Sequence, residues 1–158
     1  MYSFKITANI IKCSYPELDS EEKRLIDAAK DATQRSYSPY SGFRVGAAVV
    51  LSNGEIITGN NQENVAFPSG SCAERTAVFY ACSLYPEHSV IALAVAAYTG
   101  GEFTDNPVSP CGSCRQVLLE TEQRYCCPVK IYLYGKQFVY IVESVKDLLP
   151  LSFDSLQR

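Results

Sequence analysis

VIALAVAAY, residues 90–98, is the longest apolar stretch of the chain. It is far shorter than the roughly 20 residues that a membrane-spanning helix needs. A continuous apolar run of this length, bounded by polar segments, is typical of a buried strand. The stretch therefore predicts a buried β-strand, and the segments on either side of it predict the class of fold.

Helical and strand patterns alternate around this stretch. Asp19 followed by Glu22 resembles a capping box at the start of the first helix. The predicted helices cover residues 19–36, 72–85 and 112–124, with a last short helix before Pro150. The predicted strands cover residues 43–51, 55–59, 90–98, 130–134 and 138–142. This order predicts an α/β protein with one mixed sheet and helices on its faces.

Length and composition indicate one globular domain. The chain has 158 residues, of which 47% are hydrophobic, enough to form a sizeable core. Residues 1–18 show no clear period and are predicted to form an N-terminal extension, followed by one domain over residues 19–158. The formal net charge of −3 argues against a nucleic-acid partner. No segment is long and apolar enough to predict a membrane partner.

Cysteine and histidine counts narrow the chemistry. The single histidine, His88, excludes HExxH motifs and three-histidine zinc sites. Seven cysteines cannot all pair in disulfides, and the chain does not start with a charged and then apolar segment typical of a signal peptide. We therefore expect reduced thiols and a cytoplasmic location.

Three cysteines have the spacing of a metal site. Cys111 and Cys114 lie three residues apart at the start of a predicted helix, so their side chains share one face. Cys72, at the start of another helix, is a candidate third ligand, leaving one position of a catalytic zinc ion for water. The CxxC pair alone also fits a redox dithiol, half a zinc ribbon or two unremarkable thiols. A structural zinc site would need a fourth ligand, which Cys126 or Cys127 could supply.

Glu74 lies two residues after Cys72 and strengthens the catalytic interpretation. Zinc deaminases that act on bases combine a His-or-Cys-x-Glu motif with Pro-Cys-x-x-Cys, and their glutamate moves protons without binding the metal. The same pattern stands here as CAE, residues 72–74, and PCGSC, residues 110–114. The alternative for Glu74 is an acidic residue in the first turn of a helix, favoured by the helix dipole.

These motifs resemble those of the small homotetrameric cytidine deaminases. CAERTA, residues 72–77, and PCGSCRQ, residues 110–116, are similar to the two zinc motifs of that family. YSPYSGFRVGAA, residues 37–48, is similar to its first-strand motif. NQEN, residues 61–64, resembles its nucleoside-binding loop, and LLPLSF, residues 148–153, its C-terminal end. The resemblance covers residues 19–156. It implies a three-layer α/β/α sandwich with a central mixed five-stranded sheet.

The resemblance also implies how a nucleoside would bind. Asn61 and Glu63 are expected to form hydrogen bonds with the ribose hydroxyl groups, and Phe43 to pack against the base. Ala73 is expected to contact the substrate as well. Phe153 is expected to enter the site of a neighbouring subunit, so that the sites of a tetramer are shared between chains.

Two further side chains are expected beside the ligands. Arg75 is implied to form hydrogen bonds with the ligand thiolates, and it lies one helical turn after Cys72. Three thiolates around Zn²⁺ leave a net negative charge, which an arginine can offset. Gln116 is expected to support the zinc ligands in a similar way. Phe67 departs from the family, since many members carry tyrosine there, and any contact through that hydroxyl is lost.

The resemblance implies zinc-dependent hydrolysis of cytidine and deoxycytidine to uridine and deoxyuridine, a step of pyrimidine salvage, with one Zn²⁺ per chain. Glu74 would accept a proton from the attacking water and return it to the ring and the leaving amino group. The alternatives are a deaminase of another small cytosine compound such as a nucleoside antibiotic, a deaminase that edits RNA or DNA, and a structural zinc module. The pair Asn61 and Glu63 favours a free nucleoside, and a structural module would have no use for Glu74.

Overall fold

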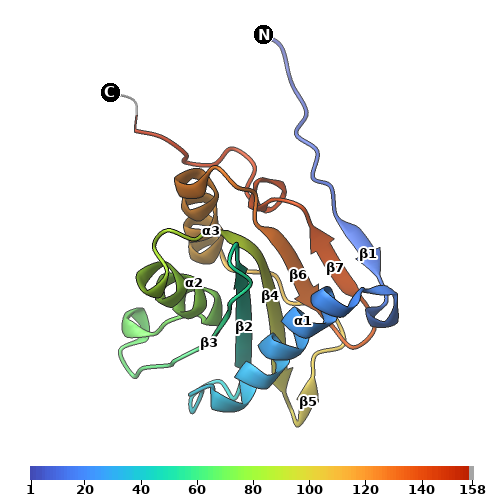
Figure 1. Cartoon of the computed structure of the whole chain (residues 1–158), viewed down its shortest axis with the longest axis vertical. Helices are drawn as coiled ribbons and strands as arrows, with labels where there is room; N and C mark the ends of the chain where they lie inside the picture. Colours follow the sequence, from blue (N-terminus) through green and yellow to red (C-terminus); the bar gives the residue numbers. More distant parts are fainter. Residues whose placement is uncertain (157–158) are drawn as a thin grey trace.

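A seven-stranded mixed sheet forms the middle of the protein in the computed structural model, which describes residues 1–156 (Figure 1). The strands run in the order β1-β7-β6-β4-β2-β3, and the short β5 pairs with β4. The β4–β6 pair is parallel, and the other pairs are antiparallel. The strands are β1 (Ile11–Cys13), β2 (Arg44–Leu51), β3 (Ile56–Asn60), β4 (Val90–Thr99), β5 (Glu102–Phe103), β6 (Lys130–Tyr134) and β7 (Val139–Val142).

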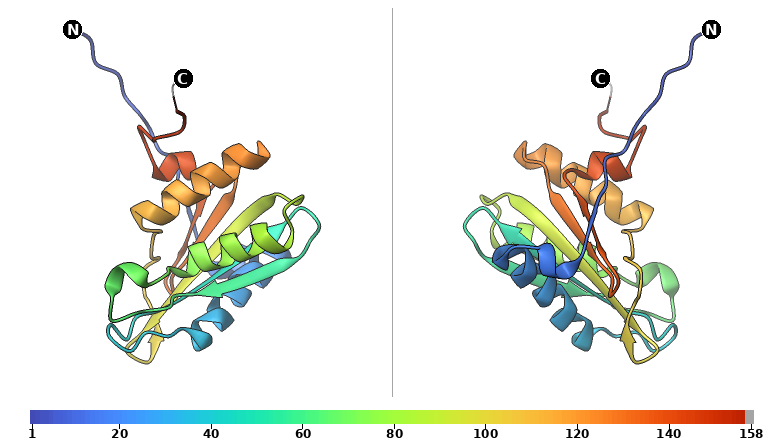
Figure 2. Two further views of the ribbon diagram at one scale, coloured as in Figure 1. Left: turned by 90° about the vertical axis from the view of Figure 1, so that its left-hand side faces the viewer. Right: turned by 90° about the vertical axis from the view of Figure 1, so that its right-hand side faces the viewer.

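Helices cover both faces of the sheet. The α-helices are α1 (Ser20–Ala32), α2 (Ala73–Leu84) and α3 (Gly112–Tyr125), and α1 lies on the opposite face from α2 and α3 (Figure 2). Each face has its own apolar core, one built with α1 and the other with α2 and α3. The predicted buried strand, within β4, lies between β6 and β2 and contributes to both cores. The predicted three-layer α/β/α sandwich is confirmed.

The predicted number of five strands is wrong, because two short strands join the sheet. β1 arises in the predicted N-terminal extension, where its three residues pair with β7. β5 lies between the predicted strand at 90–98 and the predicted helix at 112–124, and its two residues fold back on β4 through Gly100 and Gly101, which both have positive φ. Strands of two or three residues are too short to give an alternating pattern in the sequence. Residues 1–10 extend away from the sheet (Figure 1). Gln157 and Arg158, at the end of the predicted domain, lie outside the described residues.

Two predicted helices differ in their length or type. The first was expected to reach Ser36, but the α-helix ends at Ala32 and a 3-10 turn, Thr33–Arg35, follows it. The last is a 3-10 helix, Val145–Leu148. The predicted capping box of α1 is confirmed, because the Asp19 carboxylate accepts a hydrogen bond from the Glu22 N–H at 2.9 Å. The Glu22 carboxylate accepts one from the Asp19 N–H at 3.1 Å.

Close packing of β3 against α2 determines where α2 begins. A Cβ atom on Gly59 of β3 would lie 2.4 Å from the backbone nitrogen of Ala77 and 2.6 Å from the carbonyl oxygen of Ala73. Only glycine therefore allows this approach. Since both neighbours belong to the first turns of α2, the contact sets the position of the residue that precedes the helix, Cys72. Among residues 1–156, no helix is long and apolar enough to cross a membrane.

Candidate active site

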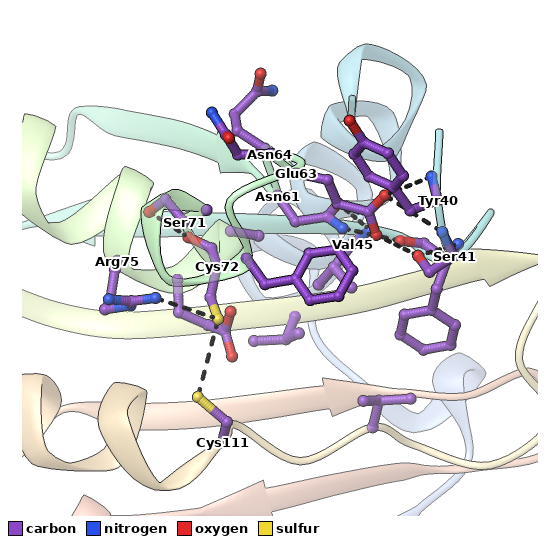
Figure 3. Close-up of a pocket in the computed structure, with 18 of the residues that line it drawn as sticks. Tyr40, Ser41, Val45, Asn61, Glu63, Asn64, Ser71, Cys72, Arg75 and Cys111 are labelled. Atoms are coloured by element: carbon purple, nitrogen blue, oxygen red, sulfur yellow. Dashed lines mark hydrogen bonds between the residues drawn. The ribbon is translucent and has the colours of Figure 1, made fainter. Parts of the chain in front are cut away.

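Three thiols meet where α2 and α3 begin. Cys72 is the N-cap residue of α2, Cys111 is the N-cap residue of α3, and Cys114 lies in the first turn of α3. The Sγ atoms of Cys72 and Cys111 are 3.8 Å apart (Figure 3). All three sulfur atoms lie within 4.8 Å of one another. Within residues 1–156 this is the only group of three or more metal-ligating side chains with such spacing.

The cluster fits a zinc ion. Thiolates are preferred zinc ligands, and Zn–S bonds of about 2.3 Å in a tetrahedral site place the sulfur atoms about 3.8 Å apart. Hydrogen bonds from the Cys114 thiol, from Arg75 and from Cys111 lower the pKa of Cys72 to about 5. The pKa of Cys114 is raised, first by its hydrogen bond to Cys72 and then by burial. Zinc binds the deprotonated form of each thiol, so a divalent cation can hold all three thiolates together.

Arg75 lies beside this cluster. Its Nη2 donates to the Sγ of Cys72 at 3.7 Å, and the pKa of the guanidinium is raised chiefly by this contact. The side chain comes from the same face of α2, one turn after the ligand. The structure thus brings Arg75 to a thiol, as the resemblance implies.

Gln116 lies elsewhere. Its Nε2 donates to the carbonyl oxygen of Phe153 at 2.8 Å, on the C-terminal segment. Gln116 is two residues after Cys114, and residues two apart on a helix do not face the same side. The structure therefore places this side chain against the C-terminal segment, and not among the thiols.

Glu74 is buried next to the cluster. The residue is 6% exposed, although it lies in the first turn of α2. Burial is the largest cause of a raised pKa of its carboxyl group. It lines the same cavity as Cys72 and Cys111. An acidic residue that served only to balance the helix dipole would be expected at the surface, so its burial favours a role inside the cavity.

A cavity of about 690 Å³ runs from the thiols to the loop after β3 (Figure 3). Four of the five predicted substrate contacts line it: Phe43, Asn61, Glu63 and Ala73. The fifth, Phe153, is not among the lining residues of its own chain and is 69% exposed. Lining residues that the sequence did not single out include Tyr40, Ser41, Val95, Val108 and Ser109.

The Asn61 side chain holds the start of β2 and the chain segment before it. Its Oδ1 accepts hydrogen bonds from the Ser36 hydroxyl at 2.5 Å and from the Val45 N–H at 2.8 Å. Its Nδ2 donates to the carbonyl oxygen of Phe43 at 2.8 Å. Both acceptor positions of the amide are therefore occupied, and one N–H remains free of these contacts.

Glu63 is held by the turn at residues 40–42. Its Oε2 accepts from the N–H groups of Tyr40 at 2.8 Å and Ser41 at 3.3 Å, and its Oε1 accepts from the Ser41 hydroxyl. The Ser41 hydroxyl is the largest cause of the lowered pKa of Glu63. The turn needs a glycine at position 42, where φ is +65°. Sequence reasoning missed Ser41 because its partner lies 22 positions away.

Phe67 lies at the mouth of the cavity. It is 76% exposed, and its ring meets that of Tyr40 edge-on, with centroids 6.0 Å apart.

His88 lies away from the thiols, next to the Ser52 hydroxyl at 3.3 Å. Cys126 and Cys127 lie outside the three-thiol group.

The fold and the cluster define a zinc-binding α/β protein with a cavity at its metal site. Residues 19–128 match the family described as the cytidine and deoxycytidylate deaminase zinc-binding region. The chain belongs to this family.

Relatives and solved structures agree with this assignment. The cytidine deaminase of Sporosarcina psychrophila is 49% identical over 83% of this chain and 90% of its own. That of Halalkalibacterium halodurans is 41% identical over 84% and 94%. The crystal structure of cytidine deaminase from Burkholderia pseudomallei superposes with a TM-score of 0.69 at 40% identity, covering 82% of this chain and 97% of that one. The Mycobacterium tuberculosis structure gives 0.68 at 33% identity, with 87% and 100% covered.

Proposed function

We propose that the protein is a cytidine deaminase that hydrolyses cytidine and deoxycytidine to uridine and deoxyuridine, releasing ammonia. One Zn²⁺ per chain is held by Cys72, Cys111 and Cys114. The observation that carries the proposal is one cavity, which Cys72, Cys111 and the buried Glu74 line at one end and Asn61 with Glu63 at the other. Cys114, buried behind the lining, completes the group of three thiols. Relatives that match most of the chain are named cytidine deaminases.

Glu74 performs the proton transfers. Zinc, when bound, supplies the Lewis acidity that lets a water molecule lose a proton near neutral pH. The Glu74 carboxylate accepts that proton and passes it to N3 of the cytosine ring, while the water oxygen bonds to C4. Glu74 then carries the proton of the new C4 hydroxyl to the amino group. The C–N bond breaks, ammonia leaves, and C4 becomes a carbonyl.

The opposite end of the cavity is suited to one sugar hydroxyl. An ionised carboxylate has about four acceptor positions, and the turn at residues 40–42 uses three of those of Glu63. Asn61 has one N–H left. The pair therefore offers one acceptor and one donor, which a single hydroxyl satisfies by donating to Glu63 and accepting from Asn61. A second hydroxyl needs no partner there, which supports the use of both ribose and deoxyribose nucleosides.

The charge at this end disfavours nucleotides and nucleic acids. Glu63 is ionised, because hydrogen bonds lower its pKa, and a phosphate bound nearby would be repelled. The formal net charge of −3 also disfavours a polyanion. Cytidine 5′-monophosphate should therefore be a poor substrate.

An absorbance assay of the purified protein tests the proposal. Loss of cytidine and of 2′-deoxycytidine should be fast, loss of cytidine 5′-monophosphate slow, and zinc content should equal one per chain. 3′-Deoxycytidine and 2′-deoxycytidine form a matched pair that shows which hydroxyl the pair Asn61 and Glu63 needs. Zinc without turnover of any cytosine nucleoside would instead favour a structural zinc module.

We also propose that the chain assembles as a homotetramer with shared sites. Phe153 is 69% exposed in the isolated chain, where its large aromatic side chain contacts water instead of apolar neighbours. One side of α2 likewise exposes large apolar side chains: Phe79, Tyr80 and Leu84. Contact with other subunits would cover both. Truncation after Pro150 should raise KM for cytidine while zinc content stays unchanged. Light scattering of the full-length protein should give the mass of four chains. A fully active monomer would refute the shared site.

A cytoplasmic location and a role in pyrimidine salvage complete the proposal. All seven cysteines are free, which suits a reducing compartment. Fractionation of cells followed by the cytidine assay checks the location, and growth on cytidine as the sole pyrimidine source checks the role.

A further inference from the structure

Arg115 links three parts of the chain next to the thiol cluster. It follows Cys114 on α3, and its side chain is half-buried. Its Nε donates to the carbonyl oxygen of Pro110 at 2.9 Å, and its Nη2 donates to the Ser109 hydroxyl at 3.0 Å. Its Nη1 donates to the carbonyl oxygen of Leu148 at 2.6 Å. One guanidinium group thus joins the loop before Cys111 to the end of the last 3-10 helix.

The loop before Cys111 has no regular structure of its own. Residues 104–110 belong to no helix or strand, and they lead directly to Cys111, whose side chain is exposed. The other two thiols are better fixed. Cys114 is fully buried on α3, and Cys72 precedes a helix packed closely on β3. Cys111 is therefore the ligand whose position depends most on its loop.

Leu148 provides a firm anchor. The buried Glu122 carboxylate accepts hydrogen bonds from the N–H groups of Val129 and Val145, both at 2.9 Å, and from the Ser144 hydroxyl at 2.9 Å. These contacts tie the start of the 3-10 helix to α3 and to the segment before β6. Arg115 therefore connects the loop to a part of the chain that is itself held from several sides.

Arg115 and Arg75 act differently. Arg75 donates directly to a thiol, whereas the contacts of Arg115 are with a hydroxyl and two carbonyl oxygens. Its planar group directs donors to three separate acceptors. A lysine ammonium at the end of a flexible chain does not reproduce this arrangement.

We infer that Arg115 is a positioning residue of the zinc site, which holds residues 109–111 so that Cys111 completes the ligand set. The inference rests on the proposed ligands Cys72, Cys111 and Cys114. Residues that orient metal ligands typically contribute 10- to 100-fold to metal affinity. The expected effect of losing Arg115 is therefore faster zinc release.

The test compares Arg115→Ala and Arg115→Lys with the wild type and with Arg124→Ala. Arg124 lies on the same helix and packs over the ring of Tyr125, so it is a matched control. Zinc release to a coloured chelator and the rate of global unfolding are measured for each protein. We expect release about 10- to 100-fold faster in Arg115→Ala, similarly fast release in Arg115→Lys, and the wild-type rate in Arg124→Ala.

Three results would overturn the inference. Wild-type release rates in both Arg115 variants would show that the loop holds itself. Release that only keeps pace with faster global unfolding would show that Arg115 acts through stability alone. A wild-type protein without zinc would refute the ligand set and this inference together. A zinc-loaded wild type whose Arg115 variants release zinc at an unchanged rate would refute only the role of Arg115. If Arg115→Ala does not fold, Arg115→Lys carries the same comparison.

Discussion

The two ends of the cavity are built in different ways. At the metal end, Cys114 is fully buried and Glu74 is 6% exposed, and both lie on first turns of helices that pack against the sheet. At the opposite end, which we propose binds the sugar and call the sugar end, Glu63 and Asn61 lie on a loop, and Phe67 is 76% exposed. Apolar packing positions the first group of residues. Hydrogen bonds between side chains and backbone position the second.

This difference matches what each end has to do. Proton transfer needs donor and acceptor within hydrogen-bond reach, and small displacements are costly. Sugar recognition tolerates more, since loops on a rigid scaffold commonly bind ligands. We therefore expect substitutions at the metal end to abolish catalysis and those at the sugar end to weaken it in steps.

The largest expected effect is that of Cys111→Ala. Two thiols cannot hold a catalytic zinc ion in place of three, so metal and activity should be lost together. Cys126→Ala is the matched control, because this exposed cysteine lies outside the cluster. Zinc content and cytidine turnover are measured for both variants. Full zinc occupancy in Cys111→Ala would contradict the ligand assignment.

Glu74→Gln should come next. The amide keeps the size of the side chain but cannot carry a proton, so kcat should fall by roughly 10²- to 10⁴-fold. Zinc content and melting temperature should stay near those of the wild type, which separates this variant from Cys111→Ala. Turnover close to the wild-type rate would mean that Glu74 is only an acidic residue in the first turn of the helix and not the proton carrier.

Glu63→Gln should have a smaller effect at the sugar end. It removes the charge that a sugar hydroxyl meets, and we expect kcat/KM to fall about 10-fold, mostly through KM. Glu55→Gln, on the exposed turn after β2, is the control. Steady-state kinetics with cytidine distinguish the two ends of the cavity. A fall in kcat with unchanged KM would mean that Glu63 belongs functionally to the metal end.

The smallest expected effect is that of Ser41→Ala. The substitution removes the hydroxyl that binds Glu63 and accepts from the Phe43 N–H at 3.0 Å, so KM should rise about threefold. The pKa of Glu63 should also rise toward its ordinary value, because the Ser41 hydroxyl lowers it. Binding of the sugar hydroxyl needs the ionised Glu63 carboxylate. As the pH falls, the Ser41→Ala variant should therefore lose affinity for cytidine at a higher pH than the wild type does. An unchanged pH profile of KM would contradict this role of Ser41.

Sequence patterns predicted the parts of the molecule that depend on neighbours in the chain. The apolar run at 90–98 and the CxxC spacing of Cys111 and Cys114 are local, because strand burial and a shared helix face follow from a few adjacent residues. The capping box of Asp19 and Glu22 is local for the same reason. Cys72 meets Cys111, which lies 39 positions away. This contact was inferred from the chemistry of the motif and not from a local pattern.

Only the tertiary structure decided the remaining features. The short strands β1 and β5 exist because β7 and β4 offer them partners, and their two or three residues carry no pattern of their own. Ser41 meets Glu63, Gln116 meets the carbonyl of Phe153, and Arg115 meets that of Leu148, across 22 to 37 positions. Such contacts depend on how whole elements pack. The sequence by itself therefore determined the class of fold and the chemistry of the metal end, whereas packing decided which side chains hold the loops around it.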